Sequence, residues 1–376
     1  SAPVCSPSRA ALLTGRVPHR AGVPGNVAHR PDAKGLPADE VTMAEMFRAA
    51  GHATAIVGKW HLGHAPDERP RAQGFDRSFV HRGGCIDNWS HYFYWAGPNR
   101  HDLYRDGDEF HAPGRYFPDL MVEEATRFVT DHRDEPFFLL FTLNAPHYPY
   151  QGEPSWLERY GPLASPRREY AAFLSSADVR IGRLLGLLDD LSLRERTIVA
   201  FQSDHGHSTE ARAHFGGGSA GPHRGAKFSL LEGGIRVPAA ISWLGRLPEN
   251  AVRDQVAHAC DWFPTLAALA GVPLPERRLD GRSLVGVIED PDAGTPHDEL
   301  HWAQADQWAV RVGRWKLVSD AHDTTDGRAI TTDEGARLYD LESDLGERDD
   351  LAADEPDVVA DLTARHERWV ETREDG

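Results

Sequence analysis

The chain has 376 residues, 40% of them hydrophobic, and its 58 acidic side chains against 41 lysines and arginines give a net charge of −17. The length suits one large α/β core with a smaller appended domain, and the acidic balance excludes a typical nucleic-acid binder, which needs a basic face. Three cysteines are too few and too widely spaced for a disulfide framework or a thiolate zinc site. Two of them, Cys85 and Cys260, are predicted to be structural thiols.

Helices and strands are predicted to alternate through the first two thirds of the chain. A capping-box pattern from Thr42 to Glu45 predicts a helix over residues 42–50, and helical spacing of leucine and alanine predicts another over residues 168–191. The alternation predicts an α/β fold in which helices sandwich a large, mostly parallel sheet.

Three apolar runs, each followed by polar residues, predict buried strands of that parallel sheet, because such strands are continuously hydrophobic. The runs cover residues 53–57, 137–143 and 197–201. In open parallel sheets, ligands bind beyond the carboxyl ends of the strands. The polar residues that follow the three runs should therefore meet at one edge.

The sequence changes in character from about residue 301. Residues 308–318 mix aromatic and β-branched side chains with charged ones, and an acidic helix is predicted from Glu355. We expect a smaller C-terminal antiparallel sheet plus a helix. The predicted domains are residues 1–300, a large α/β domain, and residues 301–376, a small α+β subdomain.

Cys5 lies at the expected start of a helix, where a nearby anion is favoured. Its position alone allows either an activated thiolate or a buried structural cysteine. The segment from Cys5 to Arg9 and the Thr-Gly-Arg that ends at Arg16 together resemble the signature of type I sulfatases, in the alkaline phosphatase superfamily. In that family the cysteine becomes formylglycine (3-oxoalanine), whose hydrated aldehyde supplies the attacking hydroxyl, and the arginine holds that group. The resemblance implies these roles for Cys5 and Arg9.

The hexapeptide from Gly58 to Gly63 follows the first apolar run and is similar to the second signature of that family. Hydrolysis of a sulfate monoester needs cations around its oxygens, a base to recycle the nucleophile and an acid for the leaving alcohol. The resemblance implies that Lys59 binds charge and that His61 takes the proton when the nucleophile is regenerated. Taken alone, the hexapeptide favours a site over the alternative, a surface turn after a strand.

Two further segments are similar to sulfate-binding blocks of the family. The segment Asn144-Ala145-Pro146-His147 follows the second apolar run, and this position favours His147 as a site residue over a solvated loop histidine. Residues 225–227 and 231–238 resemble a block whose lysine contacts sulfate and assists the leaving oxygen, which implies that role for Lys227. Positive charge from these lysines and Arg9 is what an anionic substrate requires on so acidic a chain.

The segment Ser203-Asp204-His205-Gly206 resembles the metal motif of the family, in which an aspartate and then an asparagine or histidine bind a divalent cation, usually Ca²⁺. A carboxylate suits Ca²⁺, whereas a histidine is a softer ligand and leaves Mg²⁺ or Mn²⁺ open. Members of the family also carry, before the cysteine, a first strand that ends in paired aspartates. We expect that strand and those ligands to lie outside this sequence, and we expect the bare chain to bind metal weakly and to have poor activity.

Residues 82–95 combine glycines, polar groups and aromatic rings in a predicted long loop. Aromatic faces beside amides suit stacking on sugar or aryl rings, so Asn88, Trp89 and His91 are predicted substrate contacts. The aromatic side chains could equally form the core of a covering loop.

Three loop histidines lie between the metal motif and Lys227. His223, with His207 and His214, could line the pocket, or all three could be solvated. His223 is included among the predicted substrate contacts.

The resemblance extends over nearly the whole chain and implies hydrolysis of a sulfate ester of a sugar or an aryl alcohol. It also implies a formylglycine-generating maturation enzyme as a partner and an extracytoplasmic location. A hydrolase of phosphodiesters or phosphonate monoesters, from the same superfamily, and an inactive truncated binding protein are the alternatives. The sequence has no run of 18 apolar residues, so no membrane span is expected.

Overall fold

The computed structural model describes residues 1–94 and 99–373, so Trp95 of the predicted aromatic loop lies outside the described residues. A five-stranded sheet with the order β6-β5-β2-β1-β7 forms its centre. Strand β1 runs parallel to its two neighbours β2 and β7, and the short strands β5 and β6 add an antiparallel edge. The bounds are β1 (Ala53–Lys59), β2 (Arg77–His81), β5 (Tyr104–Arg105), β6 (Asp108–Glu109) and β7 (Phe137–Thr142).

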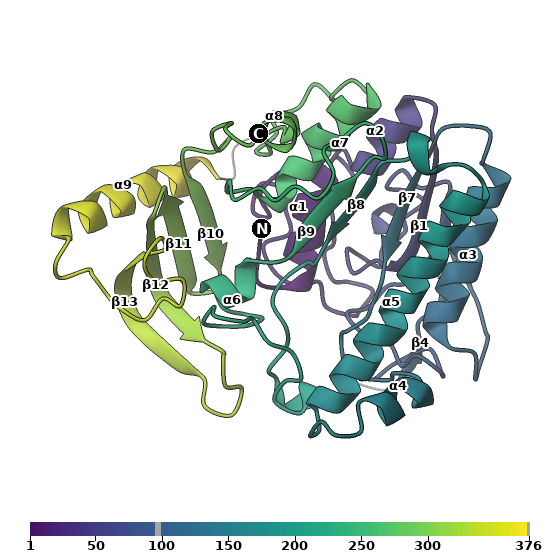
Figure 1. Cartoon of the computed structure of the whole chain (residues 1–376), viewed down its shortest axis with the longest axis horizontal. Helices are drawn as coiled ribbons and strands as arrows, with labels where there is room; N and C mark the ends of the chain where they lie inside the picture. The colour runs from purple at the N-terminus through teal and green to yellow at the C-terminus, as the bar shows by residue number, and fades with distance from the viewer. Residues whose placement is uncertain (95–98, 374–376) are drawn as a thin grey trace.

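Helices cover both faces of this sheet (Figure 1). On one face Ile56 of β1 packs into a core with side chains of α1, α2 and α7. On the other face its neighbours Ala55 and Val57 pack against α3 and α5. Because successive side chains of a strand point to opposite faces, residues 55–57 of β1 all have to be apolar. The helices are α1 (Cys5–Thr14), α2 (Met43–Ala49), α3 (Phe117–Asp131), α5 (Arg167–Asp190) and α7 (Trp262–Ala270).

The predicted helix starts agree with the structure. The hydroxyl of Thr42 accepts a hydrogen bond from the Glu45 backbone (3.1 Å), and the Glu45 carboxylate accepts one from the Thr42 backbone (2.8 Å), which completes the capping box of α2. The long helix α5 differs from its predicted bounds by one residue at each end. The expected strands at β1 and β7 are present as well.

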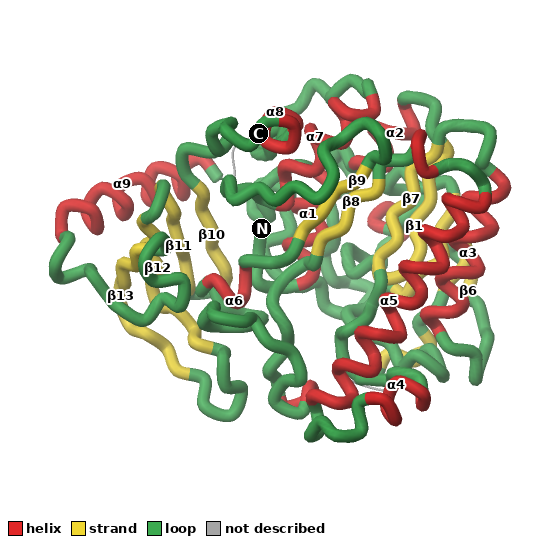
Figure 2. The backbone as a smooth tube through the Cα atoms, in the orientation of Figure 1, coloured by secondary structure: helices red, strands yellow, loops and turns green. Residues whose placement is uncertain are grey.

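The third predicted strand, β8 (Val199–Gln202), is not part of the parallel sheet. It pairs antiparallel with β9 (Ala239–Ser242) in a separate two-stranded sheet. Val199 packs into the same core cluster as Leu139 of β7, so this pair continues the layer of the main sheet (Figure 2). Within the described ranges, however, β7 is hydrogen-bonded to β1 alone. A first strand from outside this sequence stays a prediction.

The C-terminal part is a four-stranded antiparallel sheet with one long helix, as predicted. Leu362 of the helix packs on one face of the sheet, and Leu230 and Leu231 from the larger part pack on the other. The sheet is thereby docked onto the segment that follows Lys227. The elements are β10 (Leu300–Gln304), β11 (Gln307–Val312), β12 (Trp315–Asp323), β13 (Thr331–Asp340) and α9 (Pro356–Thr372).

The remaining elements are short and lie in the connections. In the part of the chain that the structure describes, no helix has the length and apolar character that crossing a membrane requires. The short elements are β3 (Tyr92–Phe93), β4 (Arg100–His101), α4 (Pro154–Arg159), α6 (Glu232–Ile235), α8 (Val285–Glu289) and the 3₁₀ turns Pro66–Glu68, Arg194–Arg196, Ala211–Ala213 and Ala259–Asp261.

Candidate active site

Cys5 is the first residue of α1 and is 2% exposed. Its Sγ lies 3.3 Å from Nε2 of His205. Burial by itself raises the pKa of the Cys5 thiol, but Lys59, His205 and Lys227 outweigh burial and hold that pKa well below its usual range. The position of Cys5 therefore favours negative charge, as expected at a helix N-terminus beside several cations.

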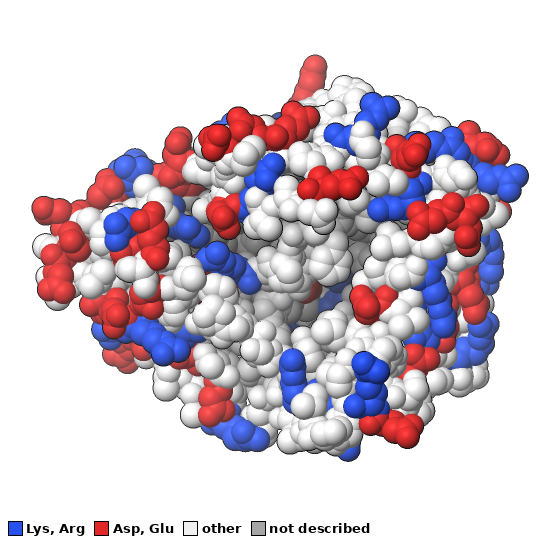
Figure 3. All heavy atoms as spheres, in the orientation of Figure 1, with Lys and Arg blue, Asp and Glu red and all other residues white. Residues whose placement is uncertain are grey.

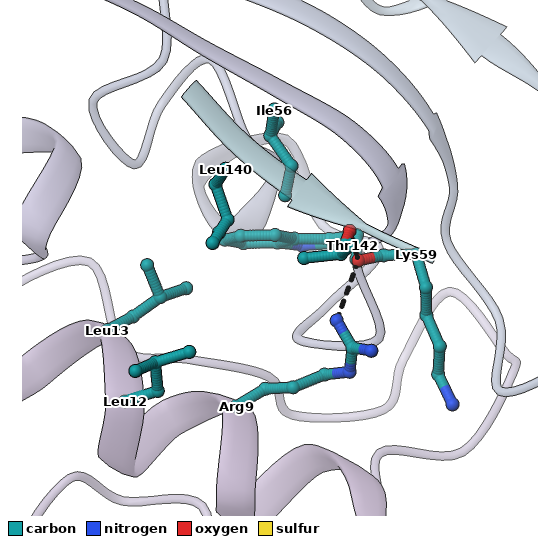
Figure 4. Close-up of a pocket in the computed structure, with 8 residues that line it drawn as sticks. Arg9, Leu12, Leu13, Ile56, Lys59, Leu140 and Thr142 are labelled. Carbon is teal, nitrogen blue, oxygen red and sulfur yellow. Dashed lines mark hydrogen bonds between the residues drawn. The ribbon is translucent and has the colours of Figure 1, made fainter. Parts of the chain in front are cut away.

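Arg9 lies one helical turn after Cys5, on the same side of α1. Its guanidinium donates a hydrogen bond to the backbone carbonyl of Lys59, at 2.8 Å (Figure 4). Lys59 ends β1 and is 2% exposed, and burial lowers its pKa while the charge on Cys5 opposes that shift. An apolar cavity of about 20 Å³ beside these two residues has room for about one water.

His61 and His147 approach the site from the segments that follow β1 and β7. Nε2 of His61 lies 3.1 Å from the carbonyl of Val27, and Nδ1 of His147 lies 2.7 Å from the carbonyl of Tyr148. A carbonyl can only accept, so each of these ring nitrogens carries a proton. Burial lowers the pKa of both rings to about 4. Both imidazoles are thus neutral near pH 7, the form in which a histidine can take up a proton.

Lys227 is 2% exposed, and its Nζ lies 3.1 Å from Oε2 of Glu210. The same oxygen accepts hydrogen bonds from Tyr148 (3.1 Å) and Ser208 (2.8 Å). Burial raises the pKa of Glu210, but Lys227 and the hydroxyl donors lower it by more, so the carboxylate stays ionised. Glu210 and Tyr148 were not predicted from the sequence, since neither belongs to a recognised motif.

Another residue that the sequence analysis missed is His81, which ends β2 opposite Lys59 in the strand register. His81 is 0% exposed, and neither ring nitrogen has a hydrogen-bond partner among the described residues. Burial, followed by the charges of Lys59 and Arg9, lowers its pKa well below the usual value. A neutral imidazole at this position fills space beside Lys59 and Arg9 without adding positive charge.

Asp204 and His205 follow β8 and complete a cluster with Cys5. The ligand atoms of these three residues all lie within 4.8 Å of one another. Nδ1 of His205 is 2.8 Å from the carbonyl of Gly206, which directs Nε2 toward Cys5 and Asp204. Burial raises the pKa of Asp204, whereas the charges of His205, Arg9 and Lys59 prevail and lower it. A carboxylate beside an imidazole fits one side of a divalent-cation site, but Ca²⁺ takes six to eight oxygens and this cluster contributes one carboxylate.

The predicted substrate contacts differ in accessibility. Trp89 is 40% exposed and its ring stacks on Tyr116, with a centroid distance of 4.7 Å. Asn88 and His91 are both 0% exposed. Asn88 accepts a hydrogen bond from Asn144 (2.9 Å) and donates one to Gln151 (3.0 Å). Nε2 of His91 lies 2.9 Å from the carbonyl of Arg115, so Asn88 and His91 are held by internal partners.

The three loop histidines do not form one cluster. Nδ1 of His223 lies 3.2 Å from the carbonyl of Leu345, in the C-terminal part. His207 is half-buried, and His214 is exposed.

The two other cysteines are buried and free of disulfide bonds. Burial raises the pKa of Cys85 to about 12 and also raises the pKa of Cys260. Both thiols are therefore protonated near pH 7, unlike the thiol of Cys5.

Positive charge in the site is concentrated below the surface. Lys59 and Lys227 are each 2% exposed. On the face shown in Figure 3, which is hollowed near its centre, basic and acidic side chains alternate around the rim without a broad basic patch. An anionic substrate would thus meet a local positive field on a chain whose net charge is −17.

Residues 1–272 match the family model described as Sulfatase. The chain belongs to the sulfatase family. It is 35% identical to human arylsulfatase A over 390 residues, which cover 93% of this chain and 74% of that protein. It is 36% identical to human N-acetylgalactosamine-6-sulfatase over 309 residues, which cover 76% of this chain and 57% of that protein. The chain thus spans little more than half the length of this second relative.

Solved structures support the assignment of this chain to the sulfatase family. The crystal structure of Ps i-CgsB superposes with a TM-score of 0.86 at 26% identity, covering 98% of this chain and 82% of that one. A sulfatase of Bacteroides thetaiotaomicron, BT33336S-sulf, gives a TM-score of 0.79 at 25% identity, covering 98% and 89%. The predicted family, the α/β fold class and the class of sulfuric ester hydrolase are confirmed, and in this family a divalent cation and a formylglycine from cysteine are the expected cofactors.

Proposed function

We propose that this sulfatase hydrolyses sulfate esters of carbohydrates or aryl alcohols to the alcohol and inorganic sulfate, with residue 5 as the nucleophile. The observation that carries the proposal is the place of Cys5, at the start of α1 and 3.3 Å from His205, in the field of Lys59 and Lys227. Formylglycine, when formed from Cys5, supplies the attacking hydroxyl as its hydrated aldehyde.

The cationic side chains bind the sulfuryl group in this proposal. The ammonium groups of Lys59 and Lys227 hold its oxygens, where charge builds up in the transition state. His147, the third predicted contact, could donate to these oxygens only with a proton on Nε2 as well, because its Nδ1–H is bound to the Tyr148 carbonyl. Arg9 fixes the carbonyl end of β1 through its bond to Lys59 and orients the nucleophile.

Proton transfers fall to His61 and Lys227. Nε2 of His61 donates a hydrogen bond to the carbonyl of Val27. Nδ1 of His61 is therefore the atom that can accept a proton from residue 5. We assign protonation of the leaving oxygen to Lys227 rather than His147, because the single N–H of neutral His147 is directed at the Tyr148 carbonyl.

Asp204 and His205 are the residues that would hold the divalent cation, whose charge would favour an ionised nucleophile. We propose Ca²⁺, with Mg²⁺ or Mn²⁺ as alternatives. A formylglycine-generating enzyme as maturation partner and an extracytoplasmic location complete the proposal. The division into a catalytic domain, residues 1–300, and a subdomain, residues 301–376, stays a prediction.

A sulfated sugar is the substrate class that we favour. One structural relative, at 26% identity and a TM-score of 0.87, is described in complex with k-i-k-neocarrahexaose, and one sequence relative is an N-acetylgalactosamine-6-sulfatase. The exposed ring of Trp89 is suited to stacking on a sugar face. Asn88 and His91 support this loop from within, and His223 remains a predicted contact.

Sulfate release from an aryl sulfate tests the proposal. The protein is co-expressed with a formylglycine-generating enzyme, and mass spectrometry of the peptide that contains residue 5 establishes the modification. We expect turnover that disappears in Cys5→Ala and persists in Cys260→Ala, a matched change at another buried cysteine. Faster hydrolysis of an aryl phosphodiester than of the aryl sulfate, or turnover that persists in Cys5→Ala, would overturn the proposal.

A further inference from the structure

Outside the active site, two histidines and a glutamate converge on one point. His101 ends β4, Glu109 ends β6, and His111 follows two residues later. Nδ1 of His101 lies 2.8 Å from Oε1 of Glu109, and Nε2 of His111 lies 3.6 Å from the same oxygen. All three donor atoms lie within 4.8 Å of one another.

We propose that His101, Glu109 and His111 bind a divalent transition-metal ion, with Zn²⁺ as the best match. Two imidazoles and a carboxylate form a donor set that suits Zn²⁺ better than Ca²⁺ or Mg²⁺. Tetrahedral ligands about 2.0–2.1 Å from Zn²⁺ lie roughly 3.3 Å from one another. The two measured separations, 2.8 Å and 3.6 Å, lie on either side of that value. The rings of His101 and His111 are stacked with centroids 4.2 Å apart, so the exposed ring of His111 has to turn for both nitrogens to point at one ion.

The three side chains differ in exposure in a way that suits a metal site. His101 is buried and held in place, whereas Glu109 and His111 are exposed and free to adjust to an ion. The side chain of His101 is 8% exposed and packs edge-on against the ring of Tyr92. Glu109 and His111 are 49% and 61% exposed, which leaves access for the ion and for a water ligand.

An ion at this point would join two structural units. His101 belongs to β4, which pairs with β3. Glu109 belongs to β6, which joins the main sheet through β5. Trp89, the exposed ring of the proposed substrate loop, lies three residues before β3. The ion would therefore fasten the β3–β4 hairpin to the edge of the main sheet, and its binding would stabilise the folded chain by mass action.

Titration of Zn²⁺ into a variant whose active-site cluster has been disabled tests the proposal. The full chain with Cys5→Ala and Asp204→Asn lacks two ligands of the active-site cluster, so calorimetry with Zn²⁺ reports on the second cluster. We expect one Zn²⁺ per chain, a higher Tm with Zn²⁺, and a visible Co²⁺ absorption band of four-coordinate type. Adding His111→Ala or Glu109→Gln should weaken Zn²⁺ binding by at least about tenfold, since one of three protein ligands is lost.

A surface pair of the same residue types is the matched control. Nδ1 of His132 lies 2.6 Å from Oε1 of Glu135, and His132→Ala in the same background should leave Zn²⁺ affinity and the Co²⁺ spectrum unchanged. Circular dichroism of each variant verifies folding. The absence of stoichiometric Zn²⁺ binding by the background protein, or equal affinity in the background and His111→Ala proteins, would overturn the proposal.

Discussion

The backbone N–H of Ala226 donates a hydrogen bond to the hydroxyl of Thr324, at 2.9 Å, one residue before Lys227. The carbonyl of Thr324 accepts a second bond from the hydroxyl of Thr209, at 2.6 Å, one residue before Glu210. Thr324 lies between β12 and β13 and is 3% exposed. A single residue of the C-terminal part thus holds both segments that carry the Lys227–Glu210 ion pair.

Replacing Thr324 with valine should disturb that ion pair. Valine keeps the shape of threonine but leaves the buried N–H of Ala226 without an acceptor, which costs about 1–3 kcal/mol. We expect kcat for an aryl sulfate to fall by roughly ten- to a hundredfold, because a small misplacement of a catalytic group slows the chemical step. Steady-state kinetics of the matured enzyme and urea unfolding measure the two effects. Thr332→Val, at an exposed position of β13, is the control, and an unchanged kcat in Thr324→Val would contradict the assigned positioning role.

Glu210→Gln should separate substrate binding from catalysis. The substitution removes a negative charge 3.1 Å from the Lys227 ammonium, so the pocket becomes more positive and KM for a sulfate ester should fall. Lys227 loses the carboxylate that positions it, so kcat should fall as well. Tyr148→Phe, which deletes one hydroxyl donor to Glu210 and leaves the charge, should change KM little. A rise in KM for Glu210→Gln would count against sulfate binding by Lys227.

Residues that lie in continuous motifs were accessible from the sequence, and residues that act through tertiary contacts were not. Lys59, His147 and Asp204 each follow an apolar run that forms a strand, and strand ends of an α/β sheet are where ligands bind. Glu210 and Tyr148 come from different segments and meet because of folding. Their pairing depends on three-dimensional contacts that no local pattern encodes.

The direction of β8 illustrates the same limit for the fold. A short apolar run predicts a buried strand, but periodicity does not tell which strand it will pair with or in which direction. β8 pairs with β9. The connection between these two strands contains the metal motif and Lys227. In contrast, the capping box of α2 and the C-terminal sheet were predicted because their signals are local.

Lys316 pairs with two buried acidic side chains, and its loss should destabilise the protein. Its Nζ lies 2.8 Å from Glu232 and 2.7 Å from Glu347, and all three side chains are at most 4% exposed. Lys316→Met would leave two uncompensated acids side by side, at a cost of about 3–5 kcal/mol. Urea unfolding at neutral pH measures that cost. Lys34→Met, at an exposed lysine, should be close to neutral, and equal stability of the two variants would contradict this account.

The same cluster should make stability depend on pH. Burial, together with the nearby charge of Glu232, raises the pKa of Glu347 from 4.5 to about 7 although Lys316 opposes the shift. Between these values the folded chain binds a proton that the unfolded chain has lost, so the contribution of Glu347 is present in full below pH 4.5 and is lost as the pH rises through 7. In Glu347→Gln the side chain is neutral throughout, and we expect the free energy of unfolding to decline less over this range than in the native protein. Urea unfolding at several pH values across the range measures the difference, with Glu342→Gln, whose side chain is 71% exposed, as the control. If the free energy of unfolding changed with pH in the same way in the native protein and in Glu347→Gln, Glu347 would keep its ordinary pKa. Lys316 would then face two ionised carboxylates, those of Glu232 and Glu347.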